Sequence, residues 1–246
     1  MAHFRNILPL RTWPRYLLWH YAQRKPFRCK VRGGGEISIR PRPSHDYQTA
    51  VEIFSDRMYE CDLEADSVRN IVDLGGNVGY SCLFWCKSYP NASVLTFEPH
   101  PTHCHLLEWH MAQNGYGNRV KLVAAAAGVV DGVANFTNED DGSAIVEGMP
   151  AGSMQVAVKD LFQVVPDAPI DLLKMDIEGS EYAILEDPRF DALAARTRSV
   201  LLEWHARGER GEKFCSERLA SLGFTVRTGR NLYDQCGMLY CSRTHG

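Results

Sequence analysis

The chain has 246 residues, of which 45% are hydrophobic and 23% charged, and this fits one globular domain that buries well over half of its unfolded surface. The net charge is −3, but residues 1–32 carry eight Arg or Lys and no Asp or Glu, so the rest carries −11 (−3 minus 8). Because phosphate contacts need a basic surface, this acidic body argues against a protein that binds nucleic acid.

The first 25 residues lack an unbroken apolar core and contain Pro9 and Pro14, which is not typical of a signal peptide. No other run approaches transmembrane length. The eight cysteines form no CxxC pair, and in a chain of this length they are typical of reduced thiols. We therefore expect a cytoplasmic protein.

Residues 1–44 form a basic N-terminal arm in this interpretation, and residues 45–246 form the main domain. A helix that starts near Pro14 would have an apolar face made of Trp13, Tyr16, Leu17 and Tyr21. This face either packs onto the main domain or contacts a membrane surface or lipid-linked substrate, since basic amphipathic helices bind anionic interfaces.

From residue 70 onward, short β-branched or apolar runs alternate with longer amphipathic segments, which is typical of a parallel sheet flanked by helices. Strands are predicted at residues 71–74, 94–97, 120–125, 170–176 and 199–204. Helices are predicted at residues 80–88, 102–114, 180–186 and 211–222.

Residues 129–165 are richer in Asp, Gly, Asn and Ser and contain the strand candidates VANFT and MQVAVKD, which predicts a hairpin and loop insertion. Near the end, strands are predicted at residues 224–228 and 238–241, with a turn at residues 229–235 between them. Two late strands in succession suggest an antiparallel pair that closes an otherwise parallel sheet.

The segment IVDLGGNVGYS, residues 71–81, places an apolar strand before a glycine-rich turn and a helix. Glycines at such a turn allow close approach of a ligand, and the helix N-terminus offers unpaired N–H groups. The residues at issue are Asp73, Gly75, Asn77 and Gly79. The spacing is not GxGxxG, which weakens a dinucleotide interpretation without excluding it.

Glu98 ends the next strand, nineteen residues after Gly79. A carboxylate at this separation accepts hydrogen bonds from ribose hydroxyls, so the pair of motifs indicates a nucleoside site. No Arg follows closely, which disfavours a 2′-phosphate and therefore NADP. The alternative is a tight turn followed by an ordinary surface acid.

With DLGGNVG, FEPHP and LLKMDIEGSEYAIL in this order, the sequence resembles the FkbM family of S-adenosylmethionine-dependent methyltransferases over about residues 45–240. The resemblance implies an α/β class I methyltransferase fold, which is Rossmann-like, with a seven-stranded, mostly parallel sheet whose last strand is reversed. It also implies S-adenosylmethionine as the cofactor and a hydroxyl oxygen as the acceptor, often that of a sugar or glycolipid.

Residue by residue, the resemblance assigns the methionine part of the cofactor to the loop of Asp73, Gly75, Asn77 and Gly79. Glu98 would take the ribose, and the adenine would lie near Ala125 and Ala126. Asp160 falls where the family has Leu-Asp, although Lys159 departs from that pattern.

Methyl transfer to a hydroxyl needs alignment and a base, and open parallel sheets bind ligands at the carboxyl ends of their strands. Lys174 and Asp176 share one strand face, and so do Glu203 and His205 on the next strand, which makes these four the catalytic candidates. Lys174 inside a strand must be paired, with Asp176 or Glu203 as the partner.

Other charged residues of this block have structural interpretations. Glu178 and Glu181 are expected in the first turn of a helix, where carboxylates favour the dipole. For Asp176 the catalytic interpretation is preferred, because it ends the central strand. Two interpretations of His205 stay open. It is a catalytic base, because the ordinary pKa of histidine lies near neutrality, or it is a structural residue at the sheet edge whose ring nitrogens have hydrogen-bond partners.

The segment EPHPTHCHLLEWH resembles a metal site, with His100, His103, Cys104, His105 and His110. No two of these histidines are four residues apart, and His103 and His110 would lie about 10 Å apart along a helix. Ligands on one helix recur at shorter spacing, so we assign no metal ligands.

The sequence thus favours an O-methyltransferase. Two alternatives from other classes stay open at this point: an NAD-dependent oxidoreductase, and a non-catalytic module that binds a nucleoside.

Overall fold

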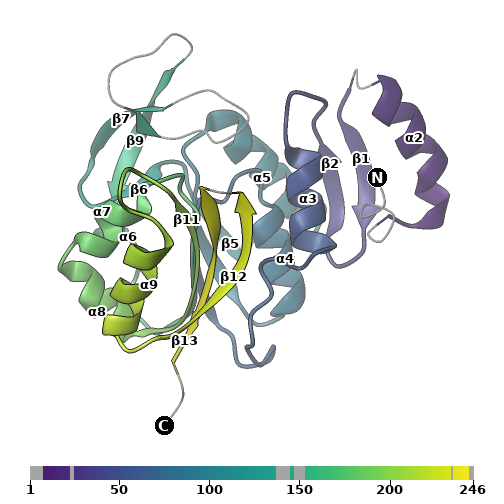
Figure 1. Cartoon of the computed structure of the whole chain (residues 1–246). Helices are drawn as coiled ribbons and strands as arrows, with labels where there is room; N and C mark the ends of the chain where they lie inside the picture. The colour runs from purple at the N-terminus through teal and green to yellow at the C-terminus, as the bar shows by residue number, and fades with distance from the viewer. Residues whose placement is uncertain (1–7, 23–24, 137–144, 147–152, 234, 244–246) are drawn as a thin grey trace.

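The central sheet of the protein has seven strands in the order β12-β13-β11-β10-β3-β4-β5 (Figure 1). The structure, a computed structural model, describes residues 8–22, 25–136, 145–146, 153–233 and 235–243. The strands of the sheet are β3 (Asn70–Leu74), β4 (Ser93–Phe97), β5 (Val120–Val123), β10 (Ile170–Met175), β11 (Thr197–His205), β12 (Thr225–Tyr233) and β13 (Cys236–Ser242).

Strand direction follows the class I methyltransferase pattern. The strands from β11 to β5 pair in parallel, whereas β13 lies antiparallel between β11 and β12. The predicted fold class, with a mostly parallel sheet and a reversed last strand, is therefore confirmed.

Helices cover both faces of this sheet (Figure 1). On one face lie α4 (Tyr80–Ser88) and α5 (Pro101–Gln113), and on the other lie α7 (Glu181–Glu186), α8 (Arg189–Ala195) and α9 (Glu212–Ser221). Leu172 and Leu173, adjacent on β10, are both fully buried and belong to two different hydrophobic clusters, one on each face. Burial on both faces explains why the central strands are continuous apolar runs.

The N-terminal elements pack beside the face of the sheet that α4 covers. They are η1 (Leu10–Thr12), α2 (Trp13–Ala22), the antiparallel pair β1 (Phe27–Val31) and β2 (Gly35–Ile39), and α3 (Asp46–Phe54). Tyr16 of α2 is buried and stacks on Tyr47, and both belong to the cluster that contains Trp85. The arm and the main domain therefore share one hydrophobic core. The strands of residues 27–39 were not predicted.

Only part of the predicted apolar face of α2 is buried. Tyr16 is 1% exposed, whereas Leu17 and Tyr21 are 39% and 81% exposed. Of the eight Arg and Lys in residues 1–32, Arg5 and Arg24 lie outside the described residues.

The predicted insertion forms a second sheet in the order β6-β9-β7-β8. Its elements are β6 (Ala126–Gly128), β7 (Gly132–Phe136), β8 (Ile145–Val146) and β9 (Met154–Asp160), followed by α6 (Leu161–Val164). Thr137, the last residue of VANFT, lies outside the described part of the chain. The strand predicted at 120–125 ends earlier, at Val123, because Ala126–Gly128 pairs with β9 in the second sheet.

One predicted turn and one helix differ from the prediction. The turn expected at residues 229–235 is mostly strand, because a register shift between Thr228 and Asn231 places Gly229 in a bulge rather than a turn. Asp234 lies outside the described residues.

Helix α8 was not predicted. Among the described residues, no helix is both long and apolar enough to cross a membrane.

Candidate active site

Two adjoining cavities lie where the central strands end. The first has a volume of about 120 Å³ and is lined in part by Glu98, Ala126 and Phe136. The second has a volume of about 340 Å³ and extends to α3 and Tyr59. Four residues line both cavities: Gly75, Asn77, Asp176 and Glu178. We call Asp176 and Glu178 the shared wall.

The glycine-rich loop lies between the two cavities, and its residues Gly75 and Asn77 line both of them. Gly75, Asn77 and Gly79 all have positive φ angles, of 86°, 46° and 90°. A Cβ atom at position 75 would collide with the backbone oxygen of Asp176, so glycine lets the ends of β3 and β10 meet. Gly79 lines neither cavity and packs against Leu107 instead.

Glu98 is 5% exposed and faces the first cavity from the end of β4. Its Oε2 accepts a hydrogen bond from the Asn77 N–H at 2.8 Å, and its Oε1 accepts one from the His100 N–H at 2.8 Å. These bonds hold the carboxylate against the glycine-rich loop, and the remaining lone pairs of both oxygens are available to a ligand.

Two residues predicted for cofactor contact, Asp73 and Ala125, line neither cavity, and Asp160, matched to the family's Leu-Asp, has a structural role. Asp73 is fully buried, lines neither cavity, and lies 3.2 Å from Lys174 Nζ. Ala125 lines neither cavity, whereas Ala126 lines the first. Asp160 caps α6 and pairs with Arg189 at 2.7 Å, because β9 ends there and the helix needs a cap.

Lys174 is 1% exposed and lies between two carboxylates. Its Nζ is 3.2 Å from Asp73 Oδ1 and 3.4 Å from Asp176 Oδ2, and it donates to the carbonyl oxygen of Gly75 at 2.5 Å. The expected pairing with Asp176 is confirmed. The alternative, Glu203, pairs with His205 instead, and Asp73 was missed because it lies opposite Lys174 on β3.

The pKa of Lys174 is raised. Burial acts to lower this pKa, but the charges of Asp73 and Asp176 outweigh it. The ammonium therefore stays charged and holds Asp176 in place.

Asp176 directly follows β10, and 22% of its side chain is exposed. Its Oδ2 accepts a hydrogen bond from the Tyr59 hydroxyl at 3.0 Å. Burial acts to raise the pKa of Asp176, but Lys174 and His205 lower it below the ordinary range. Asp176 is thus an ionised carboxylate that faces both cavities.

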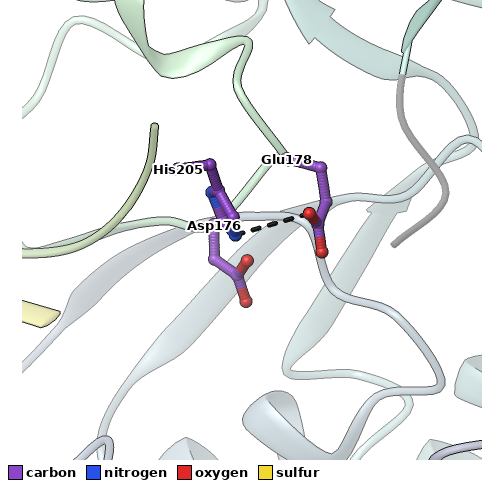
Figure 2. Close-up of side chains that lie close together, drawn as sticks. All are labelled: Asp176, Glu178 and His205. Carbon is purple, nitrogen blue, oxygen red and sulfur yellow. Dashed lines mark ion pairs between the residues drawn. The ribbon is translucent and has the colours of Figure 1, made fainter. Parts of the chain in front are cut away.

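His205 ends β11 and lies among carboxylates (Figure 2). Its Nδ1 is 3.1 Å from Glu181 Oε1, and its Nε2 is 3.4 Å from Glu178 Oε2 and 3.8 Å from Glu203 Oε1. Burial acts to lower the pKa of His205, but the bond to Glu181 and the charge of Asp176 raise it to about 9.

Glu178 and Glu203 hold protons more strongly than usual. Burial, followed by the charge of Asp176, raises the pKa of Glu178 to about 7 and raises that of Glu203 well above its ordinary value. Burial and the neighbouring charge of Asp176 therefore favour the protonated forms of Glu178 and Glu203 at this edge of the sheet.

Sequence reasoning missed three residues of the site. Glu181 does start α7 as expected, but it is fully buried, where it accepts from the Ile177 N–H at 3.0 Å and orients His205. Glu178, also expected only at a helix start, lies in the shared wall with φ of 54°. The block KMDIEGSE contained both signals, whereas nothing in the sequence linked Tyr59 to Asp176.

The histidines near Glu98 have separate partners. His100 and His103 stack with ring centroids 4.3 Å apart, and His103 Nδ1 is 3.4 Å from Glu98 Oε1. His110 is bonded to the backbone of Ser38 and Val78. Within the described ranges these histidines form no group with the spacing of metal ligands.

A family model described as "Methyltransferase FkbM domain" matches residues 73–232, which is more than half of the chain. This chain belongs to the FkbM methyltransferase family. The match contains both the glycine-rich loop and the shared wall. The cofactor of this FkbM methyltransferase is S-adenosylmethionine, and the alternative of an NAD-dependent oxidoreductase is not supported.

Curated relatives of this FkbM protein are also methyltransferases. Methyltransferase sdnD of Sordaria araneosa is 26% identical over 230 residues, which cover 78% of this chain and 88% of the relative. Methyltransferase 1 of Beauveria bassiana is 28% identical over 170 residues, which cover 58% and 68%. The solved precorrin-6y C5,15-methyltransferase of Geobacter metallireducens aligns with a TM-score of 0.47 at 13% identity, over 78% of this chain and 88% of that chain.

Proposed function

We propose that this FkbM methyltransferase transfers the methyl group to a hydroxyl oxygen of a small polyhydroxylated acceptor, a sugar or glycolipid. The observation that carries the proposal is the polar lining of the second cavity. Gln48, Thr49 and Glu52 of α3 face it from one side, and Asp176 and Glu203 face it from the other. Such groups suit an acceptor with several hydroxyls, and a volume of about 340 Å³ is typical of small-molecule sites.

In this proposal the cofactor spans both cavities. The adenosine occupies the first cavity, with Glu98 at the ribose and Ala126 near the adenine. The methionine end follows the glycine-rich loop, which lines the second cavity from Gly75 to Val78. The methyl group then lies beside the shared wall, within reach of an acceptor held against α3.

The reaction is an in-line displacement. The acceptor oxygen forms a bond to the methyl carbon while the carbon–sulfur bond breaks, and the sulfur takes that electron pair and becomes a neutral thioether. The hydroxyl proton passes to a carboxylate of the second cavity, with Asp176 as the first candidate and Glu203 as the second. Lys174 acts as a positioning residue for Asp176.

Within sugars, the acceptor that we propose first is the 2-hydroxyl of fucose on a nodulation factor. The test is incubation with labelled S-adenosylmethionine and a panel of fucosylated and unfucosylated oligosaccharides, followed by mass spectrometry of the products. We expect one added methyl group on a hydroxyl of a fucosylated member. Cofactor binding without transfer to any hydroxylated acceptor would contradict the proposal and favour a non-catalytic module.

We also propose that the arm contacts an anionic membrane surface where lipid-linked acceptors lie. The observation behind this is the exposed row of Leu10, Leu18 and Tyr21, with Arg11 and Arg15 exposed beside it. A cytoplasmic location is part of this proposal, and the eight free thiols suit a reducing compartment.

A further inference from the structure

Asp176, Glu178 and His205 bring three potential metal ligands together at the shared wall (Figure 2). One ligand atom from each lies within 4.8 Å of the others. They come from the end of β10, the turn that follows it, and the end of β11. Two separate elements of the rigid sheet therefore fix the group.

The imidazole of His205 is oriented as metal-binding histidines are. Its Nδ1 is bonded to the buried Glu181 at 3.1 Å, and this carboxylate fixes the ring so that Nε2 points to the other acids. Metal ligands commonly have such a carboxylate behind the imidazole. The separation of 3.4 Å between Nε2 and Glu178 Oε2 is too long for a good hydrogen bond. This separation fits two ligand atoms of one metal ion. When each ligand atom is about 2.1 Å from the ion, neighbouring ligand atoms lie roughly 3.0 to 3.4 Å from each other.

Glu203 gives a second, independent observation. This side chain is 11% exposed and lines the second cavity, and it has no hydrogen bond to another described residue. Its nearest charged partner is His205 Nε2, at 3.8 Å. A buried carboxylate without hydrogen bonds is costly unless a cation or a bound ligand completes its surroundings.

The charge of Lys174 does not supply that cation, because it is shared by Asp73 and Asp176 at 3.2 and 3.4 Å. In the part of the chain that the structure describes, the ion pairs of Glu178 and Glu203 are with His205 alone, and His205 also pairs with Glu181. Acidic side chains therefore outnumber basic ones at this edge of the sheet, and a divalent ion would offset the difference.

We propose that Asp176, Glu178 and His205 bind one divalent first-row metal ion such as Mn²⁺ or Zn²⁺. The inference rests on the proposed O-methyl transfer, and it departs from the expectation that no residue of the chain holds a metal. One imidazole with two carboxylates suits these ions better than Ca²⁺ or Mg²⁺, which prefer oxygen ligands alone. Three protein ligands leave coordination positions open for a substrate oxygen.

The metal would hold the acceptor hydroxyl oxygen beside the methyl group and ease loss of its proton. Bond changes are those of the proposed reaction: the oxygen–carbon bond forms, the carbon–sulfur bond breaks, and sulfur keeps the electron pair. With a cation on Asp176, Glu203 is the carboxylate left to take the proton.

The test is calorimetric titration of Mn²⁺ into the full chain after treatment with EDTA and dialysis, without acceptor. We expect one ion per chain, with the dissociation constant raised at least tenfold in Glu178→Gln and in His205→Gln. Glu217→Gln, which changes an exposed carboxylate of α9, is the matched control and should bind as the unchanged chain does. Co²⁺ gives a second readout, through visible absorption bands that His205→Gln should alter.

Absence of stoichiometric Mn²⁺ and Co²⁺ binding in a folded chain that binds S-adenosylmethionine would overturn the metal proposal. Equal binding in all three variants would also overturn it. Neither readout requires methyl transfer. A chain that binds metal as expected but methylates no hydroxyl would contradict the proposed function alone.

Discussion

Lys174 has its ammonium group between Asp73 and Asp176 with almost no exposure to water. In Lys174→Met, Asp73 loses its neighbouring charge while fully buried and Asp176 loses it while partly buried, and breaking a buried ion pair in this way costs about 3 to 5 kcal/mol. We therefore expect a fall of this size in the free energy of unfolding, measured by urea denaturation.

The matched control is Lys213→Met, since Lys213 is 87% exposed and pairs with Glu217 at 3.8 Å. Exposed pairs contribute about 0 to 1 kcal/mol, so this variant should be nearly as stable as the unchanged chain. Equal stability of the two variants would contradict the account of Lys174.

Glu98 is the residue that we propose for the ribose. Glu98→Gln keeps the size of the side chain but removes its charge, and hydrogen bonds to charged groups are worth about 1.5 to 3 kcal/mol. We expect the dissociation constant for S-adenosylmethionine, measured by calorimetry, to rise about tenfold or more. Glu60→Gln changes an exposed carboxylate elsewhere and should have no effect. Unchanged affinity in Glu98→Gln would rule out the ribose assignment.

Individual site residues could be predicted from the sequence where a motif lies at the end of a predicted strand. The carboxylates Asp176 and Glu98 were placed at the ends of predicted strands. Asp176 lines both cavities and Glu98 lines the first. Asp73 could not be paired with Lys174 in advance, because the pairing depends on the register of β3 against β10. The contact of Tyr59 with Asp176 joins residues 117 positions apart, outside the reach of local patterns.

The element that links the arm to the cofactor loop is α5, through His110. Its Nε2 accepts from the Ser38 N–H at 2.9 Å, so its Nδ1–H donates to the Val78 carbonyl oxygen at 2.7 Å. Burial lowers the pKa of His110 from 6.5 to about 4. The ring is therefore neutral in the folded chain, while the unfolded chain takes up a proton below pH 6.5.

Because the folded pKa is depressed, this contribution to stability is present above pH 6.5 and is lost as the pH falls toward 4. Between pH 7.5 and pH 5.0 we expect His110 to account for a loss of about 2 kcal/mol in the free energy of unfolding. Urea denaturation of His110→Gln at both pH values checks this. The variant should lose less on acidification, and an equal loss would contradict the assignment.

Helix α2 offers a test of the proposed membrane contact. We expect the full chain to sediment with phosphatidylglycerol vesicles, and Leu18→Ser with Tyr21→Ser to abolish this, because the pair removes most of the exposed apolar row. Val130→Ser with Val133→Ser is the control, since these valines are equally apolar and each 67% exposed. No sedimentation of the unchanged chain, or equal loss in both pairs, would end the proposal.

Elements with clear local signals at their ends were predictable, and those fixed by tertiary pairing were not. Helix α4 begins and ends as predicted, because glycines precede it and its apolar residues pack on the sheet. Among the described strands, β1 and β2 pair with each other alone, and their sequences have no clear strand pattern. Strand β6 separates from β5 because it pairs with β9. Gly229 was predicted in a turn because glycine is common there, but it lies within β12, which pairs with β13.

Over the whole molecule, the parallel sheet brings residues from 75 to 205 to one edge, where a small and a larger cavity meet at Asp176 and Glu178. The order of motifs along the chain was enough to predict this arrangement, since the carboxyl ends of parallel strands share an edge. The distribution of charge around His205 was not predictable, because it depends on how Glu181 packs beneath it.

The most direct test of the central claim, methyl transfer beside Asp176, is a comparison of labelled-methyl transfer by the unchanged chain and Asp176→Asn with the best acceptor of the oligosaccharide panel. Asp167→Asn, at a fully exposed position, is the control. We predict a loss of about 100-fold or more in transfer by Asp176→Asn, with cofactor affinity changed less than about threefold. Full transfer by Asp176→Asn at normal cofactor affinity would contradict the account.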